Sequence, residues 1–123
     1  MSQPTVPEPT GLLIHNVYFS LKEPTAAKRQ ELVDACNRYL RQHPGVLFFA
    51  CGTVAEDLTR DVNVRDFDVG LHIVFKDKAH HDQYQDAPLH LRFLQEERDN
   101  WSQVRVFDTV SKHETAGIQP VLE

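Results

Sequence analysis

The stretch FDVGLHIVF, residues 67–75, alternates apolar side chains with polar or smaller ones. An alternation with a period of two is typical of a β-strand that buries one face. One face is predicted to carry the odd-numbered residues Phe67, Val69, Leu71, Ile73 and Phe75. The other face carries Asp68, Gly70, His72 and Val74. This strand therefore predicts a sheet that packs one face on a hydrophobic core.

Three further stretches are rich in the β-branched and aromatic residues that favour strands. They cover residues 12–21, 46–54 and 101–110. In the first of them the odd-numbered face is the more apolar, and His15 is its one polar member.

Between these strands the sequence has helical spacing. Thr25 can cap a helix that runs to about residue 42. Asp77 can cap a shorter helix to about residue 85, and Pro88 begins another to about residue 98.

The resulting order, β-α-β-β-α-β, predicts an α+β protein of the ferredoxin-like type, with a four-stranded antiparallel sheet and helices on one face. Ile14, Tyr18 and Val74 make the opposite face partly apolar. Antiparallel sheets can leave a mixed face in water. A second copy of the sheet is the simplest cover, which predicts a two-fold homodimer that forms a dimeric α/β barrel.

A chain of 123 residues suits one domain with tails. The predicted domain covers residues 11–110. Residues 1–10 contain three prolines and are predicted to be a disordered tail, and residues 111–123 a second tail.

The formal net charge of −5, without any cluster of Lys and Arg, argues against a nucleic-acid partner. No apolar run approaches the roughly 20 residues of a membrane span, so no membrane partner is expected. The first residues lack the pattern of a secretory signal, and we expect a cytoplasmic protein. Cys36 and Cys51 are predicted to be free thiols. A disulfide or a reactive thiol stays open as the alternative.

Four stretches together resemble the stress-responsive A/B barrel (Dabb) domain over residues 11–110. They are IHNVYFSLKE (14–23), HPGVLFFACG (43–52), FDVGLHIVFKDKAHHDQYQDAPLH (67–90) and WSQVRVFDTV (101–110). The resemblance implies a dimeric ferredoxin-like barrel. The family often has His-Pro-x-His where this chain has Ala87-Pro88-Leu89-His90.

The resemblance also implies chemistry, since some plant members are polyketide cyclases that close a β-keto chain without metal or cofactor. Tyr84 and His90 fall on the positions of their tyrosine and histidine. A neutral imidazole can remove a C–H proton, and a phenol can donate to the enolate oxygen. His15 matches a histidine of the pocket. The predicted substrate-binding residues are His15, Val17, Phe19, Val69, Leu71 and Phe93.

Other roles stay open for these residues. Tyr84 can pack its ring under the sheet, His90 can bind a backbone carbonyl at the turn, and His15 can be structural. The sequence therefore leaves three functions: binding of a small hydrophobic or aromatic molecule, a cyclase-like activity, and a non-catalytic, stress-associated interaction protein. A cavity of about 300 Å³ or more reached by Tyr84 and His90 would favour the first two functions, and a collapsed core would favour the interaction protein.

No metal-binding motif such as HExxH or CxxC is present, and we predict neither a metal nor a cofactor. The neighbours His80 and His81 would diverge by about 100° on a helix. Asp68 and His72 share a predicted strand face, where the two side chains can form a hydrogen bond at the dimer interface.

Overall fold

The computed structural model describes residues 11–112, and it contains each predicted strand and helix. The predicted tail at residues 1–10 and most of the second tail lie outside the described residues. The elements are β1 (Leu13–Leu21), α1 (Ala26–Tyr39), β2 (Val46–Thr53), β3 (Val69–Phe75), α2 (Lys78–Gln85), α3 (Pro88–Glu97), the short 3-10 helix η1 (Arg98–Asn100) and β4 (Trp101–Val110).

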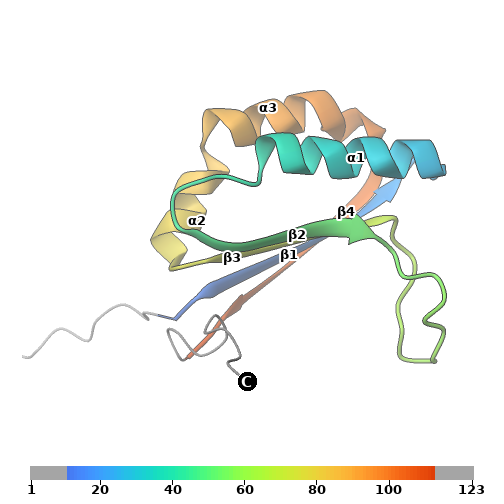
Figure 1. The fold of residues 1–123 in the computed structure, drawn as a ribbon, viewed down its shortest axis with the longest axis horizontal. Helices are drawn as coiled ribbons and strands as arrows, with labels where there is room; N and C mark the ends of the chain where they lie inside the picture. Colours follow the sequence, from blue (N-terminus) through green and yellow to red (C-terminus); the bar gives the residue numbers. More distant parts are fainter. Residues whose placement is uncertain (1–10, 113–123) are drawn as a thin grey trace, which may run out of the picture.

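The four strands form one antiparallel sheet in the order β2-β3-β1-β4. Helices α1 and α3 lie over one face of this sheet, and α2 lies at one end of it (Figure 1). This arrangement is the predicted ferredoxin-like α+β fold. In the register of the sheet, His15 of β1 lies between Ile73 of β3 and Asp108 of β4.

The helices begin where the sequence places their caps. The Thr25 hydroxyl accepts a hydrogen bond from the Lys28 amide at 3.1 Å. The Asp77 carboxylate accepts one from the His80 amide at 2.8 Å. Pro88, which lacks an amide hydrogen, stands in the first turn of α3, where that hydrogen has no helical partner.

The core lies between the helices and the sheet. The odd-numbered residues of β1 and β3 point into it, as the alternation predicted, and α1 adds the opposite wall. Its buried members include Val17, Phe19, Leu21, Leu32, Cys36, Leu40, Val69, Leu71, Ile73, Phe75 and Phe93.

The prediction was wrong at the start of β3, which begins at Val69. Phe67 lies against Tyr18 with ring centroids 4.8 Å apart, on the face without helices. The buried Asp68 turns the other way, and its carboxylate accepts hydrogen bonds from Arg29 Nε at 2.9 Å and the Leu21 amide at 2.8 Å. The alternation therefore stops at Val69, because Asp68 reaches a cation on α1.

The prediction that Asp68 and His72 share one strand face was wrong, because Asp68 turns toward Arg29 of α1, and the two side chains do not bond with each other. His72 Nδ1 bonds with Asn16 Oδ1 at 2.7 Å, on the face of the sheet without helices.

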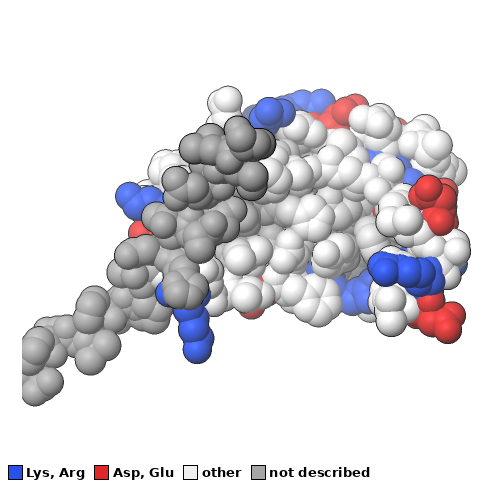
Figure 2. All heavy atoms as spheres, turned by 60° about the horizontal axis from the view of Figure 1, so that its bottom comes forward, with Lys and Arg blue, Asp and Glu red and all other residues white. Residues whose placement is uncertain are grey.

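This uncovered face exposes large apolar side chains. Phe48 of β2 and Phe107 of β4 are 51% and 52% exposed. Figure 2 shows that its centre carries uncharged side chains. The segment between β2 and β3 descends beside this face (Figure 1) and forms with it a hollow of about 520 Å³. The hollow is lined by Asn16, Tyr18, Val62, Asn63, Val64, Phe67, Arg105 and Phe107.

The turn from α1 into β2 lies directly against α2. Gly45 has φ +84°, a conformation that residues with a side chain seldom adopt. A Cβ atom at this position would be 2.4 Å from Cβ of His80. The Gly45 carbonyl also accepts a hydrogen bond from the Lys76 amide at 2.8 Å. Only glycine fits here without moving α2.

Both cysteines are free thiols, as predicted. They are neighbours: a hydrogen bond with Cys51 and burial raise the pKa of the Cys36 thiol. Among the described residues, no helix is long and apolar enough to cross a membrane.

Candidate functional site

The turn between α2 and α3 brings Tyr84 and His90 together. Helix α2 ends at Gln85, Ala87 is extended, and Pro88 starts α3 in a new direction. The rings of Tyr84 and His90 are consequently 4.7 Å apart between centroids, in an edge-on arrangement with 62° between the planes.

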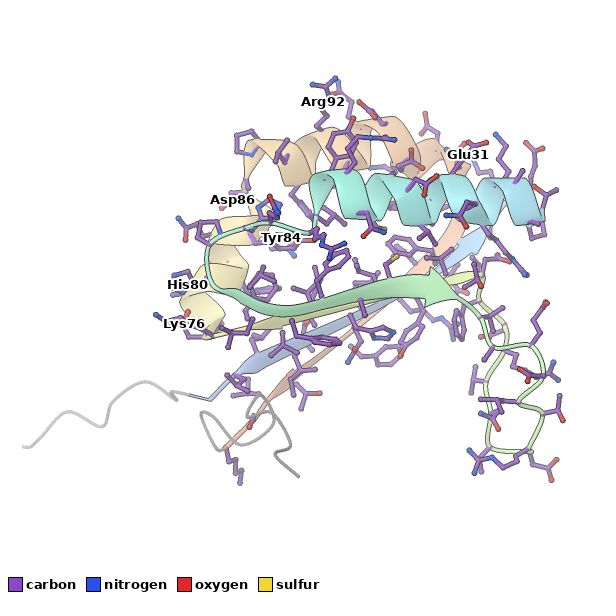
Figure 3. The ribbon with its side chains drawn as sticks, viewed as in Figure 1. Glu31, Lys76, His80, Tyr84, Asp86 and Arg92 are labelled. Carbon is purple, nitrogen blue, oxygen red and sulfur yellow. The ribbon has the colours of Figure 1, made fainter. Side chains whose placement is uncertain are left out.

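His15 of β1 joins these two rings from the sheet. The ring centroid of His15 lies 6.0 Å from that of Tyr84, and the ring centroid of Phe75 lies 5.0 Å from that of Tyr84. All three polar rings are buried: Tyr84 is 2%, His15 4% and His90 9% exposed. Figure 3 shows Tyr84 pointing from α2 into the interior. We call this group the histidine–tyrosine cluster: His15, His43, Phe75, His81, Tyr84 and His90.

The other predicted substrate-binding residues belong to the hydrophobic core rather than to an open cavity. Phe19 and Phe93 pack against each other and against Trp101. The remaining three, Val17, Val69 and Leu71, are at most 4% exposed. The hollow of about 520 Å³ lies across the sheet, and a second of about 100 Å³ lies beside Leu21 and Glu31. Neither is lined by Tyr84 or His90, so the cavity expected for binding or catalysis is not found in these two hollows, and a ligand beside the two rings requires the packed core to shift.

Two of the polar rings differ in their hydrogen bonding. His15 Nδ1 lies 2.6 Å from Asp108 Oδ1, its cross-strand neighbour. His90 Nδ1 is buried and has no hydrogen-bond partner among the described residues. A buried polar atom without a partner costs stability, and where it occurs it calls for an explanation.

Burial sets the protonation of the cluster at neutral pH. Desolvation lowers the pKa of His15, although Asp108 acts in the opposite direction. Desolvation also lowers the pKa of His90, although a hydrogen bond with the backbone of Gln85 raises it. This contact agrees with the alternative in which His90 binds a backbone carbonyl at the turn. Burial raises the pKa of the Tyr84 phenol. These shifts favour neutral imidazoles at His15 and His90 beside the neutral phenol of Tyr84, and the short His15–Asp108 contact is then a hydrogen bond to a neutral ring.

The free energy of unfolding is expected to decrease as the pH falls from about 7 to about 5. Unfolded histidines take up a proton near pH 6.5. Burial holds the pKa of His15, His72 and His90 lower in the folded chain. Below that pH the unfolded chain binds more protons, so the folded chain loses stability. Urea denaturation across this range measures the effect, and His72→Gln should show a weaker dependence. A stability that stays constant or rises would contradict it.

His15, His81 and Asp108 form a group that can hold a metal ion. One ligand atom from each lies within 4.8 Å of the others. His80, the neighbour of His81, instead bonds with Asp77 at 2.7 Å. The two adjacent histidines thus diverge, as the helical geometry predicted.

Sequence reasoning missed Asp108 as the partner of His15, and His43 as a neighbour of Tyr84. The ring centroids of His43 and Tyr84 are 5.0 Å apart, and His43 Nε2 bonds with the Tyr39 carbonyl at 2.8 Å. The pairing of β1 with β4 was the signal for Asp108, because cross-strand neighbours share one face of a sheet.

One family model matches nearly the whole described part of the chain. The model of the stress responsive A/B barrel domain, Dabb, matches residues 13–111. The chain belongs to this family. The match includes every strand and helix of the described fold, so the Dabb resemblance of the four sequence stretches is confirmed.

Solved structures show the same fold for this Dabb chain. A Dabb family protein with a ferredoxin-like fold from Mesorhizobium loti has TM-score 0.69 and 21% identity, covering 82% of this chain and 97% of its own. A dimeric ferredoxin-like protein of unknown function from Thermobifida fusca has TM-score 0.68 and 14% identity, with coverages of 89% and 100%. Hydroxynitrile lyase from Passiflora edulis has TM-score 0.67 and 18% identity, with coverages of 84% and 95%. No curated protein sequence matches the chain.

Proposed function

We propose that this Dabb protein is a cytoplasmic homodimer that binds a small, largely apolar molecule with a carbonyl or hydroxyl group beside the histidine–tyrosine cluster. The observation that carries the proposal is the buried, unpartnered Nδ1 atom of His90. A ligand oxygen placed there supplies the missing hydrogen bond. The apolar residues around the cluster favour a hydrophobic or aromatic ligand body.

The cluster is most exposed to solvent on the side of His81 and the neighbouring Asp108, where we expect a ligand to enter. The side chain of Asp108 is 39% exposed and that of His81 is 14% exposed, whereas that of His15 is 5% exposed. The ligand is small, because the core residues behind the cluster are packed and must shift to admit it. A stress-related role stays a prediction from the family.

A cyclase-like activity is the second candidate, and the contact between the rings of Tyr84 and His90, whose centroids are 4.7 Å apart, favours it. In this reaction His90 takes a C–H proton beside a carbonyl, and Tyr84 donates a hydrogen bond to the enolate oxygen. The enolate carbon then forms a bond to the carbon of a second carbonyl group of the same substrate. The new alkoxide takes the proton back from His90. The Passiflora hydroxynitrile lyase gives the fold one example of an enzyme.

The uncovered sheet face supports the homodimer. Phe48 and Phe107 are about half exposed there, and the centre of the face is uncharged (Figure 2). The Thermobifida fusca protein with this fold is dimeric. The third candidate is a non-catalytic interaction protein that acts through its dimer interface. It applies if no ligand binds beside the histidine–tyrosine cluster.

Native mass spectrometry of the protein purified from its own host tests the proposal. The expected result is a dimer whose mass includes one small ligand per chain. His90→Ala should remain dimeric and lose the ligand, and His80→Ala, outside the cluster, should keep it. A ligand-free parent dimer would favour the interaction protein, and a monomer would contradict the dimer.

Turnover separates the enzyme from the binding protein. With a linear β-polyketide as the probe, His90→Ala and Tyr84→Phe are each expected to reduce the rate of ring closure by about 10²-fold or more. Parent-like rates in both variants, or an inactive parent, would exclude the cyclase.

A further inference from the structure

Three elements that are distant in the sequence place donor atoms at one corner of the sheet. His15 comes from β1, Asp108 from the facing position of β4, and His81 from α2. The ring centroids of His15 and His81 are 5.0 Å apart. One ligand atom of each of the three residues lies within 4.8 Å of the others.

The hydrogen bonds of His81 indicate that its ring can bind a metal ion. Nδ1 lies 3.1 Å from the Asp82 carboxylate, which can only accept a hydrogen bond. Nε2 is 3.5 Å from the Gln85 amide nitrogen, which can only donate. Both contacts favour the tautomer with the proton on Nδ1 and a lone pair on Nε2. A carboxylate behind a histidine is also the usual outer partner of a metal-binding imidazole.

His15 is equally suited, since its ring faces a carboxylate. Its Nδ1 lies 2.6 Å from Asp108 Oδ1, so a proton lies between the two atoms. If this proton moves to Nε2 of His15, a metal ion can bind between Nδ1 and the Asp108 carboxylate, and the imidazole ring stays neutral.

We propose that His15, His81 and Asp108 form a binding site for a divalent transition-metal ion, with zinc as the ion that fits the donors best. Two imidazoles and one carboxylate are a ligand set of catalytic zinc sites, which keep a fourth position open. The proposal goes beyond the proposed function and does not depend on it.

The donor atoms must shift slightly to hold the ion: His15 Nδ1 and Asp108 Oδ1, which are 2.6 Å apart, must separate, and the widest spacing must shorten. Ligand atoms that each lie about 2.0–2.2 Å from zinc can be at most about 4.4 Å apart. The spread of 4.8 Å closes with small rotations of the three side chains. Asp108 is exposed at the edge of the group, which gives the ion a way in. The fourth position lies at the edge of the histidine–tyrosine cluster, where a bound water or ligand oxygen can occupy it.

Isothermal titration calorimetry with Zn²⁺ tests the site on the full chain, stripped with a chelator and produced without a polyhistidine tag. The expected result is one ion per chain with a Kd of about 10 μM or tighter. His81→Ala should weaken binding by at least about 100-fold. A visible absorption spectrum of four-coordinate Co²⁺ in the parent, absent in His81→Ala, reports the coordination directly.

His80→Ala is the matched control, because this neighbour on α2 bonds with Asp77 instead. It should bind Zn²⁺ as the parent does, and Mg²⁺, which prefers oxygen ligands, should bind to neither protein. Circular dichroism confirms that His81→Ala is folded. If it is not, His81→Gln replaces it. No binding by the parent, or equal binding by the parent and the folded His81 variant, would overturn the proposal.

Discussion

Phe75→Ala is expected to destabilise the protein by about 3–5 kcal/mol. Phe75 is fully buried at the end of β3 and is among the largest side chains of the core. Its ring lies 5.0 Å from Tyr84 and 5.6 Å from His81 between centroids. Its loss leaves a cavity within the histidine–tyrosine cluster, and the rings of Tyr84 and His81 lose a packing partner. The measurement is the free energy of unfolding from urea denaturation followed by circular dichroism.

Leu91→Ala is the control, because Leu91 of α3 is 52% exposed and should change stability by no more than about 0.5 kcal/mol. Phe75→Leu, which fills part of the cavity, should fall between the two. If Phe75→Ala costs no more than Leu91→Ala, the core does not pack as described.

Asp68→Ala is expected to destabilise the protein by about 3 kcal/mol. The Asp68 side chain is 9% exposed, and it ties three parts of the fold together. One oxygen accepts from the Arg29 guanidinium of α1 and the other from the Leu21 amide at the end of β1. Removing the carboxylate leaves the buried Leu21 amide hydrogen without a partner. Among the described residues, the Arg29 guanidinium, whose side chain is 20% exposed, then retains only its 3.4 Å contact with the exposed Glu56. Thermal and urea denaturation measure the loss.

Asp66→Ala is the matched control. Asp66 also pairs with an arginine, Arg105, at 2.6 Å, but its side chain is 64% exposed. Exposed ion pairs contribute up to about 1 kcal/mol. Asp68→Asn, which keeps an acceptor for the Leu21 amide, should cost less than Asp68→Ala. Equal losses in Asp66→Ala and Asp68→Ala would show that burial of the Asp68 pair has no effect.

The fold was predictable because its signals are local. The alternation from Val69 to Phe75, the caps at Thr25 and Asp77 and the break at Pro88 each lie within a few residues of the element they define. The error at Phe67 and Asp68 has the opposite origin. Asp68 is placed by Arg29, 39 positions earlier, and no periodicity within the strand contains that information.

In the candidate site, too, the local contacts could be predicted and the contacts between distant residues could not. The contact between Tyr84 and His90 could be predicted, since the two residues are six positions apart with the turn at Pro88 between them, and the Dabb pattern marks both positions. The convergence of His15 and Asp108 requires the register of β1 on β4, which the alternation of either strand leaves undetermined. Whether the predicted apolar residues line a cavity or fill the core depends on packing in three dimensions. The sequence shows only that they are buried.

The turn at Gly45 affects residues of the candidate site that lie far from it in the sequence. Because this residue has a left-handed backbone and its missing side chain leaves room for His80, it sets how closely α2 approaches the sheet. Helix α2 carries Tyr84 and His81 together. A methyl group at position 45 would push α2 away and so displace the rings of Tyr84 and His81 together. Gly45, which has no side chain, therefore controls how close these two rings lie to the sheet.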